Sequence, residues 1–199
     1  MKRNNQPALI LVDIQKAFED HKWGKRNNLM AEENIKQLLN LWRTKDMPVV
    51  HIQHYSDNPT SPFHPSNKTF EIKDIVKPAD SEPVFTKKVN SAFIGTDLES
   101  YLRKSDIISV VITGLTTPHC ISTTTRMSGN LGFKTTLLSD ATAAFELRDI
   151  NGKLLDAETV HQVSLATLNE EFAKIMTTDE LLCKIREEAC SFSPNEQEV

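Results

Sequence analysis

Three side chains with chemical potential follow apolar, β-branched segments of the chain. Asp13 comes directly after ALILV at 8–12, and Lys87 follows EPVFT at 82–86. Cys120 follows IISVVIT at 107–113 after the loop GLTTPH. A thiol can attack a carbonyl carbon, a carboxylate can take its proton and return it to a leaving amine, and an ammonium can stabilise the thiolate. The combination predicts nucleophilic catalysis if the fold brings the three groups together.

Each group also has a structural interpretation. Asp13 precedes IQKAFED and could be a helix N-cap, while the Lys87–Lys88 pair is typical of a solvated turn. Cys120 could be a small buried hydrophobe. It also falls in the first turn of a predicted helix, where the helix N-terminus would lower the pKa of the thiol.

The elements that must position these groups alternate along the sequence. Apolar runs predict strands at 8–12, 49–53, 82–86, 107–113, 134–139 and 173–176. Amphipathic segments predict helices at 31–45, 96–104, 120–130, 156–171 and 178–189, with Thr96 as the cap of the second. This alternation predicts an α/β fold, a three-layer α/β/α sandwich with a mostly parallel, roughly six-stranded, Rossmann-like sheet. Residues 54–80 are expected to form a long loop over the edge where the strands' carboxyl ends meet, which is where such folds bind ligands.

Length and composition narrow the class of protein. The 199 residues, with 23 basic and 27 acidic side chains, predict a single domain over 1–199 with a core at about 7–182 and a frayed tail at 191–199. The formal net charge of −4 gives no reason to expect nucleic acid or a membrane surface as partner. Three cysteines, 120, 183 and 190, and no apolar run long enough for a membrane span predict a reduced, cytoplasmic protein. No GxGxxG or P-loop is present.

Longer motifs around these residues resemble the isochorismatase-like cysteine hydrolases, which include nicotinamidases, carbamoyl-amide hydrolases, isochorismatases and streptothricin hydrolase. The resemblance is carried by ALILVDIQKAF around Asp13, KKVNSAFIGTDL from Lys87 and VVITGLTTPHCISTTTRMSGNLGF around Cys120. The segment SDATAAF at 139–145 and the late helix with His161 support it more weakly. The segments occur in the family's order and spacing from about residue 7 to residue 182.

The resemblance implies a triad of Asp13, Lys87 and Cys120. Lys87 fits better than Lys88 because the family's lysine precedes the serine of the SAF motif, here Ser91, by four positions. The resemblance also implies a cis peptide bond between residues 115 and 116. The amides of Thr116 and Cys120 would then form an oxyanion hole.

The sequence departs from the metal-dependent members of the family. Nicotinamidases carry an Asp-x-His metal motif after the second strand, where this chain has His54 and Ser56. His51, His54 and His64 could be read as a metal cluster, but His51 lies inside the predicted strand and would point away from His54. We therefore expect no metal and no cofactor.

Candidate substrate-binding residues lie on loops or element ends near the same edge: Phe18, Trp23, His64, His119 and Phe145. The predicted function is hydrolysis of a small-molecule amide-type C–N bond through a thioester. The alternatives are an isochorismatase-type vinyl-ether hydrolase, which needs no thiol, and a catalytically inactive binding module. A homo-oligomer, dimer or tetramer, is expected from the resemblance and from the aromatic residues of the 54–80 loop, Tyr55, Phe63 and Phe70.

Overall fold

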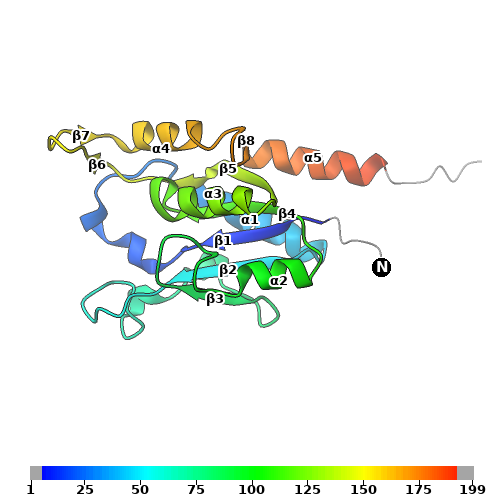
Figure 1. The fold of residues 1–199 in the computed structure, drawn as a ribbon, viewed down its shortest axis with the longest axis horizontal. Coiled ribbons are helices and arrows are strands. Elements are labelled where there is room, and N and C mark those ends of the chain that lie inside the picture. The colour runs from blue at the N-terminus through cyan, green and yellow to red at the C-terminus, as the bar shows by residue number, and fades with distance from the viewer. Residues whose placement is uncertain (1–5, 192–199) are drawn as a thin grey trace, which may run out of the picture.

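A sheet of six parallel strands forms the centre of the protein in a computed structural model that describes residues 6–191. Its strands are β1 (Ala8–Val12), β2 (Val49–His54), β3 (Val84–Lys87), β4 (Ser109–Leu115), β5 (Lys134–Ala143) and β8 (Lys174–Met176). They lie in the order β3-β2-β1-β4-β5-β8, every neighbouring pair parallel (Figure 1). The predicted α/β fold with a mostly parallel six-stranded sheet is confirmed.

Helices cover both faces of this sheet because successive strand residues point to opposite sides. Leu9 and Leu11 of β1 pack toward α1 (Ala31–Thr44) and α5 (Thr178–Ser191). Ala8, Ile10 and Val12 belong to the core on the other face. That face is covered by α2 (Leu98–Lys104), α3 (Ser122–Asn130) and α4 (Ala157–Ala166). Because β1 is apolar on both faces, it is buried throughout.

Several element boundaries differ from the predicted ones. The helix expected at 120–130 is wrong at its start: a π-helical turn covers Thr117–Ile121 and α3 begins only at Ser122. Pro118 in that turn has no N–H to donate. The Ile121 N–H donates to the carbonyl of Thr116, five residues earlier, at 3.3 Å, which is the pattern of a π-helical turn. The helix expected at 96–104 begins at Leu98, with Asp97 as its cap, while the Thr96 hydroxyl accepts a bond from the Leu98 N–H.

Two further segments were not fully captured by the sequence pattern. The helix expected at 156–171 ends at Ala166, and a short hairpin of β6 (Leu147–Arg148) and β7 (Leu154–Leu155) precedes it. The loop after β2 contains two 3₁₀ turns, Lys68–Phe70 and Asp74–Val76. Two more 3₁₀ turns, Lys16–Glu19 and His21–Trp23, follow β1.

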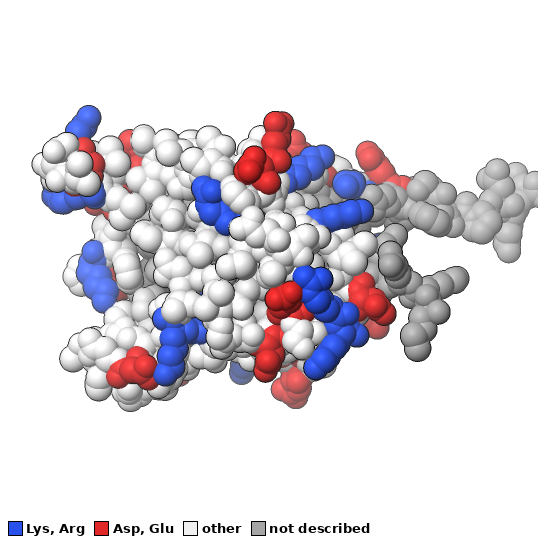
Figure 2. Space-filling model, viewed as in Figure 1, with Lys and Arg blue, Asp and Glu red and all other residues white. Residues whose placement is uncertain are grey.

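The distribution of surface charge and the length and polarity of the helices can be compared with the expectation of no nucleic-acid or membrane partner. On the face in Figure 2, acidic and basic side chains are interspersed and no continuous area of one sign appears. Across the described part of the chain, every helix is too short or too polar to cross a membrane.

The order of the strands reverses between β1 and β4, so their carboxyl ends open a crevice at this point. Gly114 allows the two strands to meet closely there. It has a positive φ of 121°, and a Cβ at this position would lie 2.0 Å from the Val12 carbonyl oxygen. Asp13 and the turn carrying Cys120 follow these two strands at the same edge.

Candidate active site

Asp13 extends β1 into the crevice in a left-handed backbone conformation, with φ of 54°. Aspartate is among the few residues other than glycine that tolerate this region, and such positions are common at functional sites. The side chain does not cap a helix, because the following 3₁₀ turn begins at Lys16 with Gln15 as its cap. Instead its Oδ2 accepts a hydrogen bond from Lys87. Oδ1 is buried without a hydrogen-bond partner among the described residues.

Lys87 reaches this carboxylate from the end of β3. Its Nζ lies 2.6 Å from Asp13 Oδ2, 3.0 Å from His54 Nδ1 and 3.2 Å from Cys120 Sγ. An ammonium has three N–H donors, so these three acceptors saturate it. Lys88 points outward and pairs with Asp57 at 2.9 Å. Of the two lysines, only Lys87 enters the buried cluster.

Cys120 lies in the π-helical turn and is largely buried. Burial, reinforced by the negative charge of Asp13, raises the pKa of the thiol to about 12, and the Lys87 ammonium opposes this only in part. The expectation that a helix N-terminus lowers the pKa of this thiol is therefore wrong. The turn differs from a regular helix start, and a second anion beside Asp13 is costly. Cys120 is a neutral thiol at neutral pH.

Burial also raises the pKa of Asp13, although the Lys87 ammonium beside it acts in the opposite direction. A carboxylate with a raised pKa is a stronger base than an exposed one. The cluster thus joins the Asp13–Lys87 pair to a thiol that burial keeps protonated.

His54 is the member of this cluster that sequence reasoning did not place there. It is the last residue of β2 and lies in register with Lys87 of β3. Burial, followed by the charge of Lys87, lowers the pKa of its imidazole to about 4, so the ring is neutral at pH 7. The available signal was its place at the carboxyl end of a strand between those carrying Asp13 and Lys87. His51 points elsewhere, as expected, and pairs with Glu82 at 2.9 Å.

Asp13, His54 and Cys120 could in principle ligate a cation, because one ligand atom of each lies within 4.8 Å of the others. Lys87 Nζ, however, contacts all three side chains at 2.6–3.2 Å. A metal at the centre of this triangle would have to displace a buried ammonium that is already hydrogen-bonded. The residues therefore fit an ammonium better than a metal ion.

A cavity of about 200 Å³ opens above these groups. Its lining residues are Asp13, Phe18, Trp23, His54, Phe63, Asn90, Thr116, His119 and Cys120. The ring centroid of Phe18 lies 5.3 Å from that of Trp23 and 5.3 Å from that of Phe63. These three side chains form an aromatic wall of the cavity. A larger hollow of about 660 Å³ at the opposite edge, beside Pro7 and Lys134, contains none of these groups.

The predicted substrate-binding residues occupy different places. Phe18, Trp23 and His119 line the cavity, whereas Phe145 lies behind Phe18, with their centroids 6.1 Å apart. His64 is not among the lining residues, and its Nδ1 lies 2.7 Å from Ser66 Oγ.

Thr116 and Cys120 line the cavity, and the Leu115–Thr116 peptide bond is cis. The Thr116 hydroxyl lies 3.0 Å from Nδ1 of His119.

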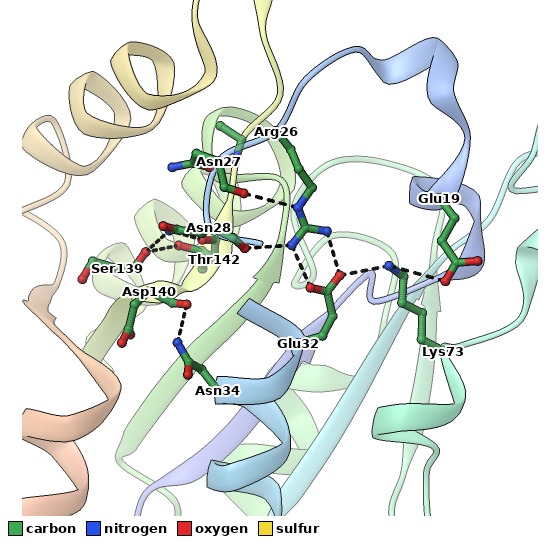
Figure 3. Close-up of polar contacts among 11 residues, drawn as sticks. Glu19, Arg26, Asn27, Asn28, Glu32, Asn34, Lys73, Ser139, Asp140 and Thr142 are labelled. Atoms are coloured by element: carbon green, nitrogen blue, oxygen red, sulfur yellow. Dashed lines mark hydrogen bonds and ion pairs between the residues drawn. The ribbon is translucent and has the colours of Figure 1, made fainter. Parts of the chain in front are cut away.

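Residues 26–28, which follow Trp23 in the sequence, are held by a polar network (Figure 3). Arg26 binds both carboxylate oxygens of Glu32 at 2.8 and 2.7 Å, and Lys73 binds the same carboxylate at 2.9 Å. Asn28 donates to the carbonyls of Ser139 and Thr142. The indole N–H of Trp23 bonds the Ala17 carbonyl at 2.8 Å. These contacts fix the segment from Trp23 to Asn28 against α1 and the end of β5.

The aromatic residues of the 54–80 loop find neighbours within the chain. Phe63 packs edge-on against His54, with their ring centroids 5.1 Å apart. Tyr55 packs edge-on against Phe70, with their ring centroids 6.3 Å apart. Because these aromatic side chains already have neighbours within the chain, they do not need a second subunit to cover them. The homo-oligomer therefore stays a prediction.

Comparisons with known proteins agree with this fold. The family model of the isochorismatase domain matches residues 7–180. Isochorismatase family protein YrdC of Bacillus subtilis is 64% identical over 175 residues, which cover 88% of this chain and 94% of that protein. A crystal structure of an isochorismatase-family protein from Chromobacterium violaceum has a TM-score of 0.89 at 37% identity, covering 92% of this chain and 94% of that one. N-carbamoylsarcosine amidase of Arthrobacter is 25% identical over 185 residues, covering 80% of this chain and 70% of that protein. The chain belongs to the isochorismatase family of hydrolases.

Proposed function

We propose that this protein hydrolyses an amide-type C–N bond of a small molecule through a thioester on Cys120. The observation that carries the proposal is the buried Lys87 ammonium, hydrogen-bonded to both Asp13 Oδ2 and Cys120 Sγ, two residues that line the cavity. The likeness to an enzyme named N-carbamoylsarcosine amidase supports amide chemistry.

The first half of the reaction forms the thioester. Sγ attacks the carbonyl carbon while its proton passes to Asp13, whose unpaired Oδ1 is free to accept it. The C–N bond then breaks, and Asp13 returns the proton to the leaving nitrogen. Because the thiol is neutral at rest, proton transfer accompanies attack, and the adjacent Lys87 stabilises the negative charge that develops on sulfur.

The second half releases the acid. Asp13 takes a proton from water as the water oxygen attacks the thioester carbonyl. The C–S bond breaks, and the proton returns to sulfur, which regenerates the thiol. In both halves the backbone amides of Thr116 and Cys120 are the proposed donors to the oxyanion. One such donor typically contributes about 3 kcal/mol to acyl transfer. Lys87 has no N–H left for this task, because its three donors are already bound.

A screen of small carboxamides, ureido compounds and carbamoylated amines tests the proposal. We expect release of the amine together with the matching acid, and loss of at least a thousand-fold in kcat for Cys120→Ala. Asp57→Asn, which alters an exposed carboxylate paired with Lys88, is the matched control and should keep the activity.

Other results would overturn the proposal. Turnover of a vinyl ether that survives Cys120→Ala would indicate isochorismatase-type chemistry. Tight binding of screened compounds with no product would indicate an inactive binding module.

A further inference from the structure

The imidazole of His54 has one nitrogen committed to the buried cluster and one directed elsewhere. Lys87 is a donor only, so Nδ1 of His54, 3.0 Å away, must be its acceptor. A neutral imidazole carries one proton, which then resides on Nε2. The lowered pKa of the ring agrees with this neutral form. Lys87 thereby fixes the tautomer of His54.

The ring is also held in place. The side-chain amide of Gln15 is buried and bonds both backbone groups of His54. The backbone N–H of His54 donates to Gln15 Oε1 at 2.9 Å, and Gln15 Nε2 donates to the backbone carbonyl of His54 at 3.1 Å. Phe63 packs edge-on against the imidazole at 5.1 Å. The side chain lines the cavity, and Nε2 has no hydrogen-bond partner among the described residues. A fixed donor facing a ligand cavity is a recognition group.

The rest of the lining indicates what it recognises. Phe18, Trp23 and Phe63 supply flat apolar walls. Asp13 is the one charged side chain among the described lining residues, and Lys87 already neutralises it. A substrate carboxylate would enter without a cation to pair with, at a high desolvation cost. The cavity suits an uncharged, planar molecule with a hydrogen-bond acceptor.

We propose that His54 is a specificity-determining residue whose Nε2–H donates to an acceptor atom of an uncharged planar amide, away from the scissile carbonyl. This inference rests on the proposed amide hydrolysis and names the class of substrate for the same site. It also assigns Lys87 a second task, because the ammonium that supports the thiol sets the direction of the His54 donor.

Binding and NMR on the Cys120→Ala protein test this without turnover. The probes are benzamide and the three pyridine carboxamides, which differ from it by one ring nitrogen. In ¹⁵N-histidine-labelled protein at pH 7, His54 should show a proton on Nε2 and none on Nδ1. At least one pyridine carboxamide should shift the Nε2–H signal and bind about 3- to 10-fold more tightly than benzamide, the gain of one neutral hydrogen bond.

Substitutions separate recognition from support of Lys87. His54→Gln can accept from Lys87 through its carbonyl oxygen and donate through its amide, so it should retain the preference for the pyridine carboxamide. His54→Leu should abolish the preference, so that the pyridine carboxamide and benzamide bind with about equal affinity. His64→Gln, at a histidine that lies outside the lining of the cavity and pairs with Ser66, is the matched control and should leave the preference unchanged.

Three results would overturn the inference: a proton on Nδ1 of His54, an undiminished preference in His54→Leu, or no binding of any of the four probes. A failure of the proposed function is distinguished from these, because it would appear as turnover without acylation of Cys120 in the wild-type protein.

Discussion

Lys87 Nζ donates to Asp13 Oδ2 at 2.6 Å, although 74 positions of sequence separate the two residues. Both side chains are buried, and each would be unstable there without the other. Burial, reinforced by the charge of Asp13, raises the pKa of the nearby Cys120 thiol to about 12. We infer that the pair serves to move one proton between sulfur, nitrogen and water.

Breaking this pair should destabilise the protein. Lys87→Met leaves the Asp13 carboxylate buried and unpaired, which should lower the free energy of unfolding by about 3–5 kcal/mol. Asp13→Asn/Lys87→Met removes both charges and should recover most of that loss, while activity stays abolished in both variants. Urea unfolding and amide turnover provide the two readouts. Wild-type stability of Lys87→Met would show that the pair is not buried as described.

The protonated thiol should be visible in its alkylation. Because the pKa of Cys120 is raised to about 12, its labelling by iodoacetamide should keep increasing beyond pH 10. Asp13→Asn removes a negative charge that raises this pKa, so labelling at pH 8 should become faster. Peptide mapping by mass spectrometry separates Cys120 from the exposed Cys183, the internal control. A plateau near neutral pH would instead indicate a resting thiolate.

Acid should weaken the network that holds the Trp23 segment. Burial favours the neutral acid, but hydrogen bonds from Arg26 and Lys73 lower the pKa of Glu32 from 4.5 to about 2. Since the pKa is depressed by folding, the stabilisation is complete above about pH 4.5 and is lost as the pH falls toward 2. It amounts to about 3 kcal/mol.

Glu32→Gln isolates this contribution from that of other carboxylates. The difference in unfolding free energy between wild type and variant should be largest near pH 7 and shrink below pH 4.5. A difference that does not vary with pH would exclude the ion pair as its source.

Metal removal should not affect turnover. The ammonium of Lys87 occupies the position that a cation held by Asp13, His54 and Cys120 would need. We expect purified protein to contain no stoichiometric zinc, iron or manganese, and prolonged chelation to leave kcat unchanged. Loss of activity on chelation, with recovery on adding metal, would assign these side chains to a metal centre.

The strands and the edge of the sheet at which the site lies could be predicted from the sequence, because each follows from a rule that holds for a whole strand. Apolar runs located the six strands, and the rule that parallel strands end at one edge brought Asp13, Lys87 and Cys120 to the same crevice. The choice of Lys87 over Lys88 came from the family resemblance. In the structure Lys87, the last residue of β3, contacts Asp13 and Cys120, whereas Lys88 follows the strand and pairs with Asp57.

Other features depend on tertiary contacts that spacing does not encode. The position of His54 follows from its register with Lys87 across two strands, and the raised pKa of Cys120 follows from burial beside Asp13. The π-helical turn at Thr117–Ile121 has the same residue pattern as a regular helix start. His64 follows β2 by ten positions, yet the loop carries it to Ser66 and not into the lining of the cavity.

In the proposed reaction Cys120 carries the acyl group during turnover. This step is tested directly by mixing the enzyme with an amide that it hydrolyses and quenching the reaction rapidly with acid. Intact-mass measurement and peptide mapping of the quenched protein follow. We expect a mass increase equal to the acyl fragment, located on the peptide with Cys120 and absent in Cys120→Ala. Steady turnover with Cys120 unmodified at every quench time, or wild-type turnover by Cys120→Ser, would contradict it.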